Sequence, residues 1–302
     1  MRRLKGTVLF LRLAGTGKVG MLYVWRMAAS VSLALSGLAG AQLCAQSNNP
    51  PLVQHALANE LRNARDPQHP MRYRLHKASP RLSQTKYIYE TRDGGVAELV
   101  AVNGQPLSGE DAAKEKARLD ALLADPTKQQ SRKTNEEKDA QRALKVLRAL
   151  PVAFIYEYAG NEVGKQGPVA KFNFRPNPNY DPPDMETRVL DSMQGQIWID
   201  VKQERVERLE GSLIHDVDYG WGLLGRLYKG GWIELEQAPV YGNQWRIVHF
   251  KMDISGRILF KTKEFQTVEN TSDYEPLPLG MSYAQAIEMM RNRNEEVGKL
   301  RK

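Results

Sequence analysis

Apolar and polar residues alternate through one long stretch of the chain, Gly195 to Asp273. β-branched and aromatic residues recur there in short runs, and Gly, Asn and Asp separate the runs at the spacing of antiparallel strands joined by tight turns. Turns are expected at Gly242-Asn243 and Ser255-Gly256. The pattern predicts five strands: Gly195–Asp200, Arg208–Ile214, Gly231–Ala238, Trp245–Ile254 and Arg257–Thr267.

The first half of the chain shows the same period in shorter segments. Asp93-Gly94-Gly95 separates two of them and is a strong hairpin signal, because glycine tolerates the positive φ that such turns need. A loop with four prolines, Arg175–Pro183, cannot be regular structure. The predicted strands are Met71–Lys77, Thr85–Thr91, Val96–Val102, Val152–Tyr158 and Pro168–Arg175.

Helical periodicity occurs in four segments. The first is Pro51–Arg65, and the last begins at Ser282, where Gln285 completes a capping box. Between them, one helix begins at Ser108 and ends before Asp125-Pro126, and a second runs over Ser131–Leu150. Since these two helices interrupt a run of strands, we expect them to lie across one side of the sheet. The fold class is α+β, with a mostly antiparallel sheet of about ten strands.

The positive charge of the chain is concentrated at its beginning. The 302 residues carry a formal net charge of +8, but residues 1–45 hold six basic residues and no acidic one. Beyond them, 37 basic residues face 35 acidic ones, so the body lacks the electrostatic footprint of a nucleic-acid-binding protein. No nucleic-acid partner is expected.

Residues 1–45 read as an upstream extension followed by a secretory signal peptide. Arg26 precedes a short run of small apolar residues, Met27–Ala39, and small-residue cleavage sites follow at Ala41 and Ala45. Export to the periplasm is predicted; a retained anchor, a lipid-anchored Cys44 and secretion are the alternatives. Cleavage after Ala45 leaves a cysteine-free single domain, 46–302, with a two-helix insertion near 108–150.

No motif in the chain predicts catalysis, a cofactor or a metal. Gly15–Gly20 matches G-x-G-x-x-G, but the signal sequence follows it in place of a βαβ unit. The nearest histidine cluster, His215-Asp216-Val217-Asp218, is better explained as a solvated turn than as a metal site. We therefore expect a protein without enzymatic activity, with no catalytic residues, no cofactor and no metal.

One connection between strands is unusual for its apolar content. Tyr219–Tyr228 combines aromatic residues, leucines and glycines, and such a segment either closes over the core or contacts a partner or lipid. The candidate apolar contacts comprise three residues of this connection and five of the two inserted helices. They are Trp221, Leu223, Leu224, Leu119, Leu122, Leu123, Val146 and Leu147.

Short motifs resemble the LolA/LolB-like periplasmic lipoprotein carriers, and in particular their uncharacterised outer-membrane lipoprotein-sorting-protein-like branch. The segments are Gly195–Asp200, Arg208–Gly211, Gly220–Gly222 and Phe174–Pro178, and the resemblance covers Pro51 to Leu277. It implies a strongly curved open sheet, an unclosed barrel, with helices over its concave face and an apolar cavity for acyl chains. No lipid-contacting residue of that family matches position by position.

Two functions follow from this fold. The first is a periplasmic carrier, expected to be a monomer, that binds the acyl chains of a lipid or lipoprotein and exchanges them with a membrane-associated donor or acceptor protein. The second is an envelope module that senses stress or binds a protein partner and transports no lipid. The sequence does not name the ligand.

Overall fold

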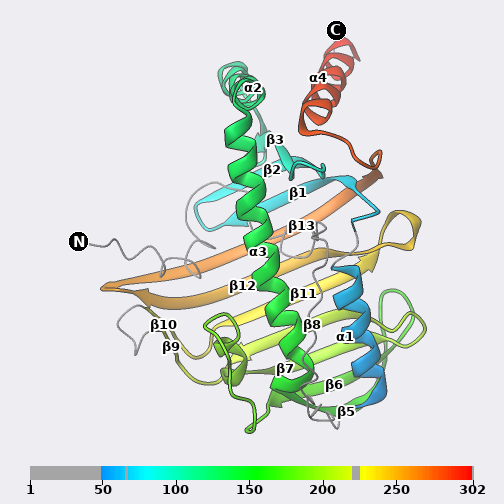
Figure 1. The fold of residues 1–302 in the computed structure, drawn as a ribbon, viewed down its shortest axis with the longest axis vertical. Helices are drawn as coiled ribbons and strands as arrows, with labels where there is room; N and C mark the ends of the chain where they lie inside the picture. Colours follow the sequence, from blue (N-terminus) through cyan, green and yellow to red (C-terminus); the bar gives the residue numbers. More distant parts are fainter. Residues whose placement is uncertain (1–48, 65–66, 220–224, 301–302) are drawn as a thin grey trace, which may run out of the picture.

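The computed structural model describes residues 49–64, 67–219 and 225–300, with side chains up to residue 293. Within these residues it contains four α-helices and one open antiparallel sheet of thirteen strands, an α+β fold (Figure 1). The helices are α1 (Pro51–Asn63), α2 (Gly109–Ala124), α3 (Pro126–Ala153) and α4 (Tyr283–Leu300), and the 3-10 turns are η3 (Arg188–Ser192) and η4 (Tyr241–Asn243).

Eleven strands follow one another in the order β4-β3-β2-β1-β13-β12-β11-β8-β7-β6-β5, and the short strands β9 and β10 attach to β12. Their bounds are β1 (Met71–Ser79), β2 (Leu82–Tyr89), β3 (Val96–Val102), β4 (Gln105–Pro106), β5 (Phe154–Val163), β6 (Pro168–Pro176), β7 (Met193–Asp200), β8 (Arg205–Leu213), β9 (Val217–Tyr219), β10 (Gly225–Leu227), β11 (Trp232–Pro239), β12 (Trp245–Ile258) and β13 (Lys261–Pro276). The predicted α+β class and antiparallel sheet are confirmed. The three strands beyond the expected ten are β4, β9 and β10, each of two or three residues.

The last hairpin is longer than its sequence pattern predicts. β12 continues through Ser255-Gly256 to Ile258, so the turn predicted there is wrong. At Gly256 the strand pairs with Leu227 of β10, and a Cβ on Gly256 would lie 2.6 Å from the carbonyl oxygen of Arg226. The glycine thus serves close backbone approach between strands, a role that local turn statistics do not distinguish from a turn.

The helix predicted over Ser131–Leu150 is longer at both ends. It begins at Pro126, where the Asp125 side chain accepts a hydrogen bond from the Thr127 amide, and it continues past Pro151 to Ala153. Ala149 and Ala153 are buried in the core beneath it. Packing of the last turn therefore outweighs the hydrogen bond that Pro151 cannot donate.

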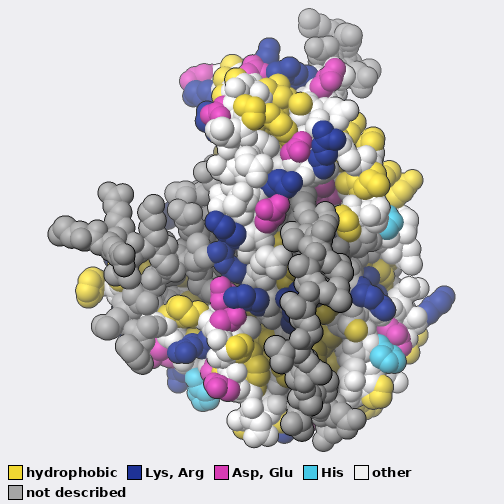
Figure 2. Space-filling model, in the orientation of Figure 1, with side chains coloured by type: hydrophobic (Ala, Val, Ile, Leu, Met, Phe, Trp, Pro, Cys, Tyr) yellow, Lys and Arg dark blue, Asp and Glu magenta, His cyan; other side chains and the backbone are white. Residues whose placement is uncertain are grey.

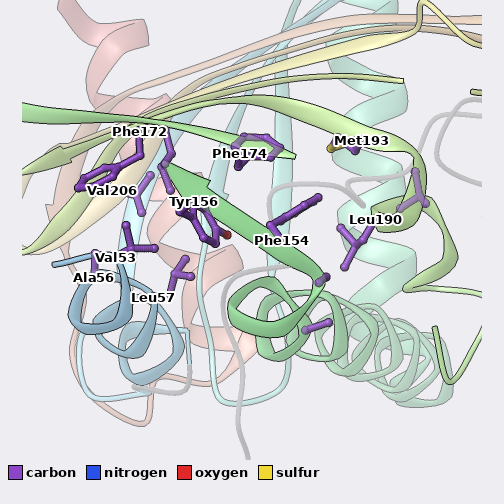
Figure 3. Close-up of a cluster of buried hydrophobic side chains, with 14 of the residues drawn as sticks. Val53, Ala56, Leu57, Phe154, Tyr156, Phe172, Phe174, Leu190, Met193 and Val206 are labelled. Carbon is purple, nitrogen blue, oxygen red and sulfur yellow. The ribbon is translucent and has the colours of Figure 1, made fainter. Parts of the chain in front are cut away.

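Two helices cover one face of the sheet, which we call the inner face. α3 crosses the strands from β3 to β5, and α1 lies beside its C-terminal half over β7 and β8 (Figure 1). The main core forms there, where α1 packs against β5, β6, β7 and β8 (Figure 3). Among its aromatic rings, Phe154 and Phe174 lie 4.7 Å apart.

Buried carboxylates attach both helices to the sheet. Glu60 of α1 accepts two hydrogen bonds from the Arg205 guanidinium, at 2.9 and 3.0 Å, and one from the Val206 amide of β8. Glu136 of α3 accepts a hydrogen bond of 2.8 Å from the Gly95 amide, next to β3. Burial is the main cause that raises the pKa of Glu136 to about 7.

The packing of the core predicts that the free energy of unfolding depends strongly on single buried side chains. Ile197 of β7 is 1% exposed, so Ile197→Ala should lower the free energy of unfolding by about 2–5 kcal/mol through lost burial and the cavity left behind. Val163→Ala is the matched control, because Val163 is 93% exposed and its loss should cost within about 0.5 kcal/mol. Urea unfolding measures both; equal costs for the two variants would contradict this packing.

Glu136 predicts a pH dependence of stability with a defined sign. Its pKa is higher in the folded chain than the ordinary glutamate value of 4.5, so the folded state binds more protons and stability falls as pH rises from about 4.5 to about 7. The slope is at most about 1.4 kcal/mol per pH unit. Urea unfolding at pH 5 and pH 7.5 should show that Glu136→Gln removes this component, and an unchanged pH profile in the variant would contradict it.

Candidate functional site

The inner face of the sheet carries continuous rows of apolar side chains. Directly paired residues of antiparallel strands share a face. The register therefore aligns one row across the five strands β6, β7, β8, β11 and β12: Phe172, Ile197, Leu209, Leu235 and Phe250. A neighbouring row ends in Ile233 and Met252. The apolar surface thus continues well beyond the strands beneath α1.

The outer face is polar over the same strands. Trp198 lies between two cations, with Lys171 4.9 Å and Arg208 5.1 Å from its ring centroid. Glu234 of β11 pairs with Lys251 of β12. The two faces therefore differ in chemistry, and the continuous apolar rows lie on the inner face.

The side of α3 toward the sheet changes character along the helix. Leu144 and Leu147, in its C-terminal half, form a buried cluster with Ala64 of α1. In its N-terminal half the buried residues are Gln129, Glu136 and Ala140, which offer little apolar volume. Lys, Arg, Asp and Glu side chains are spread along the outside of α3 (Figure 2). The N-terminal half of α3 therefore has too few apolar side chains to pack against the apolar residues of the central strands.

Four apolar residues of the central strands lie outside the hydrophobic clusters described above. Leu235 and Phe250 are half-buried, and Met252 and Phe265 are 7% and 8% exposed. None of the four belongs to a hydrophobic cluster formed by residues that the structure describes. We take these four residues, called the central apolar patch, as the candidate binding surface.

The row becomes polar where it passes beyond β12. Phe250 pairs with Glu269 of β13, and Glu269 pairs with Lys77 of β1. Glu269 is 2% exposed, and its carboxylate forms an ion pair of 2.6 Å with the Lys77 ammonium. This row of the inner face is therefore amphiphilic, apolar from β6 to β12 and charged at β13 and β1, whereas the neighbouring rows remain apolar at Phe265 of β13 and Leu75 of β1.

The structure separates the candidate leucines of the two inserted helices from the central apolar patch. Leu119 and Leu122 are buried against α4 residues such as Ile287, and Leu123 packs at the edge of that cluster. Their role as ligand contacts stays a prediction, and their observed packing joins α2 to α4 and β3. The helical period predicted their burial and could not show which element buries them.

Val146 and Leu147 of α3 lie nearer to the main core. Val146 packs against that core, and Leu147 belongs to the small cluster between α1 and α3. The other three candidates, Trp221, Leu223 and Leu224, lie outside the described residues. The central apolar patch was not among the candidates, although the alternation of Phe250, Met252 and their neighbours indicated one face of a strand.

The acidic residues after His215 are engaged in ion pairs. Arg226 of β10 donates to both carboxylate oxygens of Asp218, at 2.6 and 2.9 Å, and lies 3.5 Å from Asp216. These contacts join β9 to β10, which favours the structural interpretation of this segment. Among the described residues, no group of three or more His, Cys, Asp or Glu side chains is placed to hold a metal ion.

No helix within the described ranges combines the length and apolar character that a membrane crossing requires.

Comparison with known proteins gives matches in structure alone: no protein-family model matches the chain, and no curated protein matches it in sequence.

Three solved structures are similar. One is a DUF1329 family protein from Desulfovibrio piger ATCC 29098, with 10% identity, TM-score 0.30, and coverage of 78% of this chain and 96% of that one. Another is a LolA superfamily protein from Nitrosomonas europaea, with 11% identity, TM-score 0.27, and coverage of 76% and 93%. The third is a putative outer membrane lipoprotein-sorting protein domain from Vibrio parahaemolyticus, with 12% identity, TM-score 0.30, and coverage of 78% and 98%. Likenesses this distant say nothing of the function of this chain.

Proposed function

We propose that this protein is a non-enzymatic, exported carrier that binds acyl chains on the inner face of its sheet. The observation that supports this function is the central apolar patch, Leu235, Phe250, Met252 and Phe265, which lies outside the clusters formed by the described core. Apolar surface that the protein does not use for its own core is a binding surface by default.

The energetics of such a site suit an acyl chain. Each methylene removed from water contributes about 0.8 kcal/mol, so a chain that buries ten of them gains roughly 8 kcal/mol before the cost of ordering. The contact is non-directional, which agrees with a surface of Leu, Phe and Met rather than of aligned polar groups. A carrier must also release its ligand. Attachment of α3 by polar contacts such as Glu136 with Gly95 would let its N-terminal half open at moderate cost.

The alternative function, a protein-binding or stress-sensing module, is favoured by a different observation. The turn between β12 and β13 places Leu259 and Phe260 in solvent, with Phe260 97% exposed. A protruding aromatic side chain is a typical anchor for a protein partner. The two functions separate experimentally, because only the carrier binds lipid on the inner face.

The carrier function predicts uptake of an acyl probe that depends on the inner face. Delipidated protein should bind a fluorescent C16 fatty acid at micromolar concentration, and Leu235→Asp should weaken binding at least tenfold because it places a carboxylate among apolar side chains. Val268→Asp is the matched control: Val268 is also half-buried, but pairs with Lys251 on the outer face. It should bind as the parent protein does.

Fluorescence titration measures this binding, and thermal unfolding verifies that both variants fold. Absence of probe binding to the parent protein would contradict the carrier function and select the alternative. Equal loss in both variants would contradict the location of the site. Mass spectrometry of lipids extracted from protein purified from its native envelope would then identify the natural ligand.

A further inference from the structure

The polar end of the inner face contains a lysine whose charge is not matched by an ion pair. Lys86 of β2 pairs with Leu75 of β1 and with Leu99 of β3. Its side chain therefore lies on the inner face, as does that of Leu75. Lys77, two residues after Leu75 on β1, points to the same face. Lys86 is half-buried, and no described carboxylate forms an ion pair with it.

The surroundings of Lys86 are rich in positive charge. Burial is the main cause that lowers the pKa of Lys86, and the next causes are the like charges of Lys77 and Arg118. The carboxylate of Glu115 acts in the opposite direction and raises this pKa, and Arg132 of α3 again lowers it. Four cations from β1, β2, α2 and α3 thus converge on one end of the inner face, which we call the basic end.

The carboxylates nearby are already engaged. Glu115 of α2 accepts two hydrogen bonds of 2.7 Å from Arg118 and one of 2.8 Å from the Leu99 amide. Glu269 pairs with Lys77, at 2.6 Å. Glu136 of α3 has a pKa of about 7, so its negative charge is incomplete at neutral pH. Positive charge therefore remains in excess at the basic end.

The two arginines of this group also have structural contacts. Arg118 donates to the Ala97 carbonyl oxygen at 2.6 Å, and Arg132 donates to the Gly95 carbonyl oxygen at 3.3 Å. These bonds cover the open edge of β3 and hold the guanidinium groups in place. Lys86 has no such contact among the described residues, which leaves its three donors for a ligand.

The basic end lies at a useful distance from the central apolar patch. β2 and β12 are three strand spacings apart in the sheet, about 14 Å at about 4.8 Å per spacing. The row of Phe250 continues through Glu269, Lys77 and Gln84, and Lys86 lies beside Gln84 in the neighbouring row. An acyl chain that covers Leu235 and Phe250 could therefore cross β13 and β1 and bring its polar group to Lys86. The apolar patch and the basic end thus follow one another on the face as an acyl chain and its anionic head do in the ligand.

We propose that the ligand of this protein is an anionic amphiphile, bound with its acyl chain on the central apolar patch and its carboxylate or phosphate head at Lys86. The inference rests on the carrier function proposed above and goes beyond it by naming the charge class of the ligand. A head group with one negative charge fits the excess charge of the basic end, and the opposite charge in a half-buried site strengthens the contact.

The structural alternative is that Lys86 only covers Leu75 and Leu99 with its aliphatic stem while its ammonium group reaches solvent. Lys86→Met separates the two roles because it keeps an unbranched apolar side chain and removes the charge. Lys251→Met is the matched control: Lys251 lies on the outer face, 4.8 Å from the Trp232 ring centroid.

The test compares two ligands with the same chain, hexadecanoic acid and hexadecanol, by displacement of a fluorescent acyl probe at pH 7.5. The parent protein and Lys251→Met should bind the acid at least tenfold more tightly than the alcohol. In Lys86→Met this preference should fall to about twofold, with the affinity for the alcohol unchanged.

The outcomes distinguish the two proposals. If the parent protein binds acid and alcohol equally, the head-group inference is overturned while the carrier function stands; if it binds neither, the carrier function itself fails. Inorganic phosphate provides the third arm. Displacement of the acid by phosphate at comparable concentration would identify a site for free anions and overturn the lipid head group as its occupant.

Discussion

The structure depends on a mismatch between long strands and the narrow helices that cross them. β12 and β13 have 14 and 16 residues, roughly 46 and 53 Å at about 3.3 Å per residue. A helix is only about 10 Å wide, so α3, which crosses both strands, covers about 10 Å of that length. Because side chains alternate between faces along the whole strand, the apolar inner face extends past what two helices can bury. This excess apolar surface is the physical origin of the candidate site.

The way the helices are attached has the same consequence. α1 packs closely on the sheet through Val53, Ala56 and Leu57, and its buried Glu60 pairs with Arg205. The N-terminal half of α3 has no comparable apolar stripe and is held by polar contacts near β3. The protein therefore has one half, over β5 to β8, where both helices pack closely on the sheet, and another, over β11 to β3, where α3 is attached by polar contacts. Binding and release of a ligand both favour the second half.

The inner face as a whole has the pattern of an amphiphile. Its apolar rows run from Phe172 to Phe250, and ionic groups follow from Glu269 to Lys86. An acyl chain with a charged head would satisfy both parts at once, whereas a neutral lipid would leave the basic end without a counter-charge. The proposed carrier function and the proposed preference for an anionic head group thus rest on one arrangement of side chains across neighbouring strands.

The sequence by itself determined the elements and the class of fold. Alternation predicted the main strands, capping residues predicted the starts of α2 and α4, and Gly242-Asn243 predicted its turn; these signals are local, so they survive without tertiary contacts. The turn predicted at Ser255-Gly256 was wrong because Gly256 allows the close approach of a neighbouring strand. α3 is longer than its sequence pattern predicted because buried alanines stabilise its last turn. The site was beyond prediction for the same reason. Leu235, Phe250 and Lys86 are 15 and more residues apart, and only the register of the five successive strands β11, β12, β13, β1 and β2 places them on one face. Tertiary structure alone decided which apolar residues pack beneath the helices and which lie outside the clusters that the helices form with the sheet.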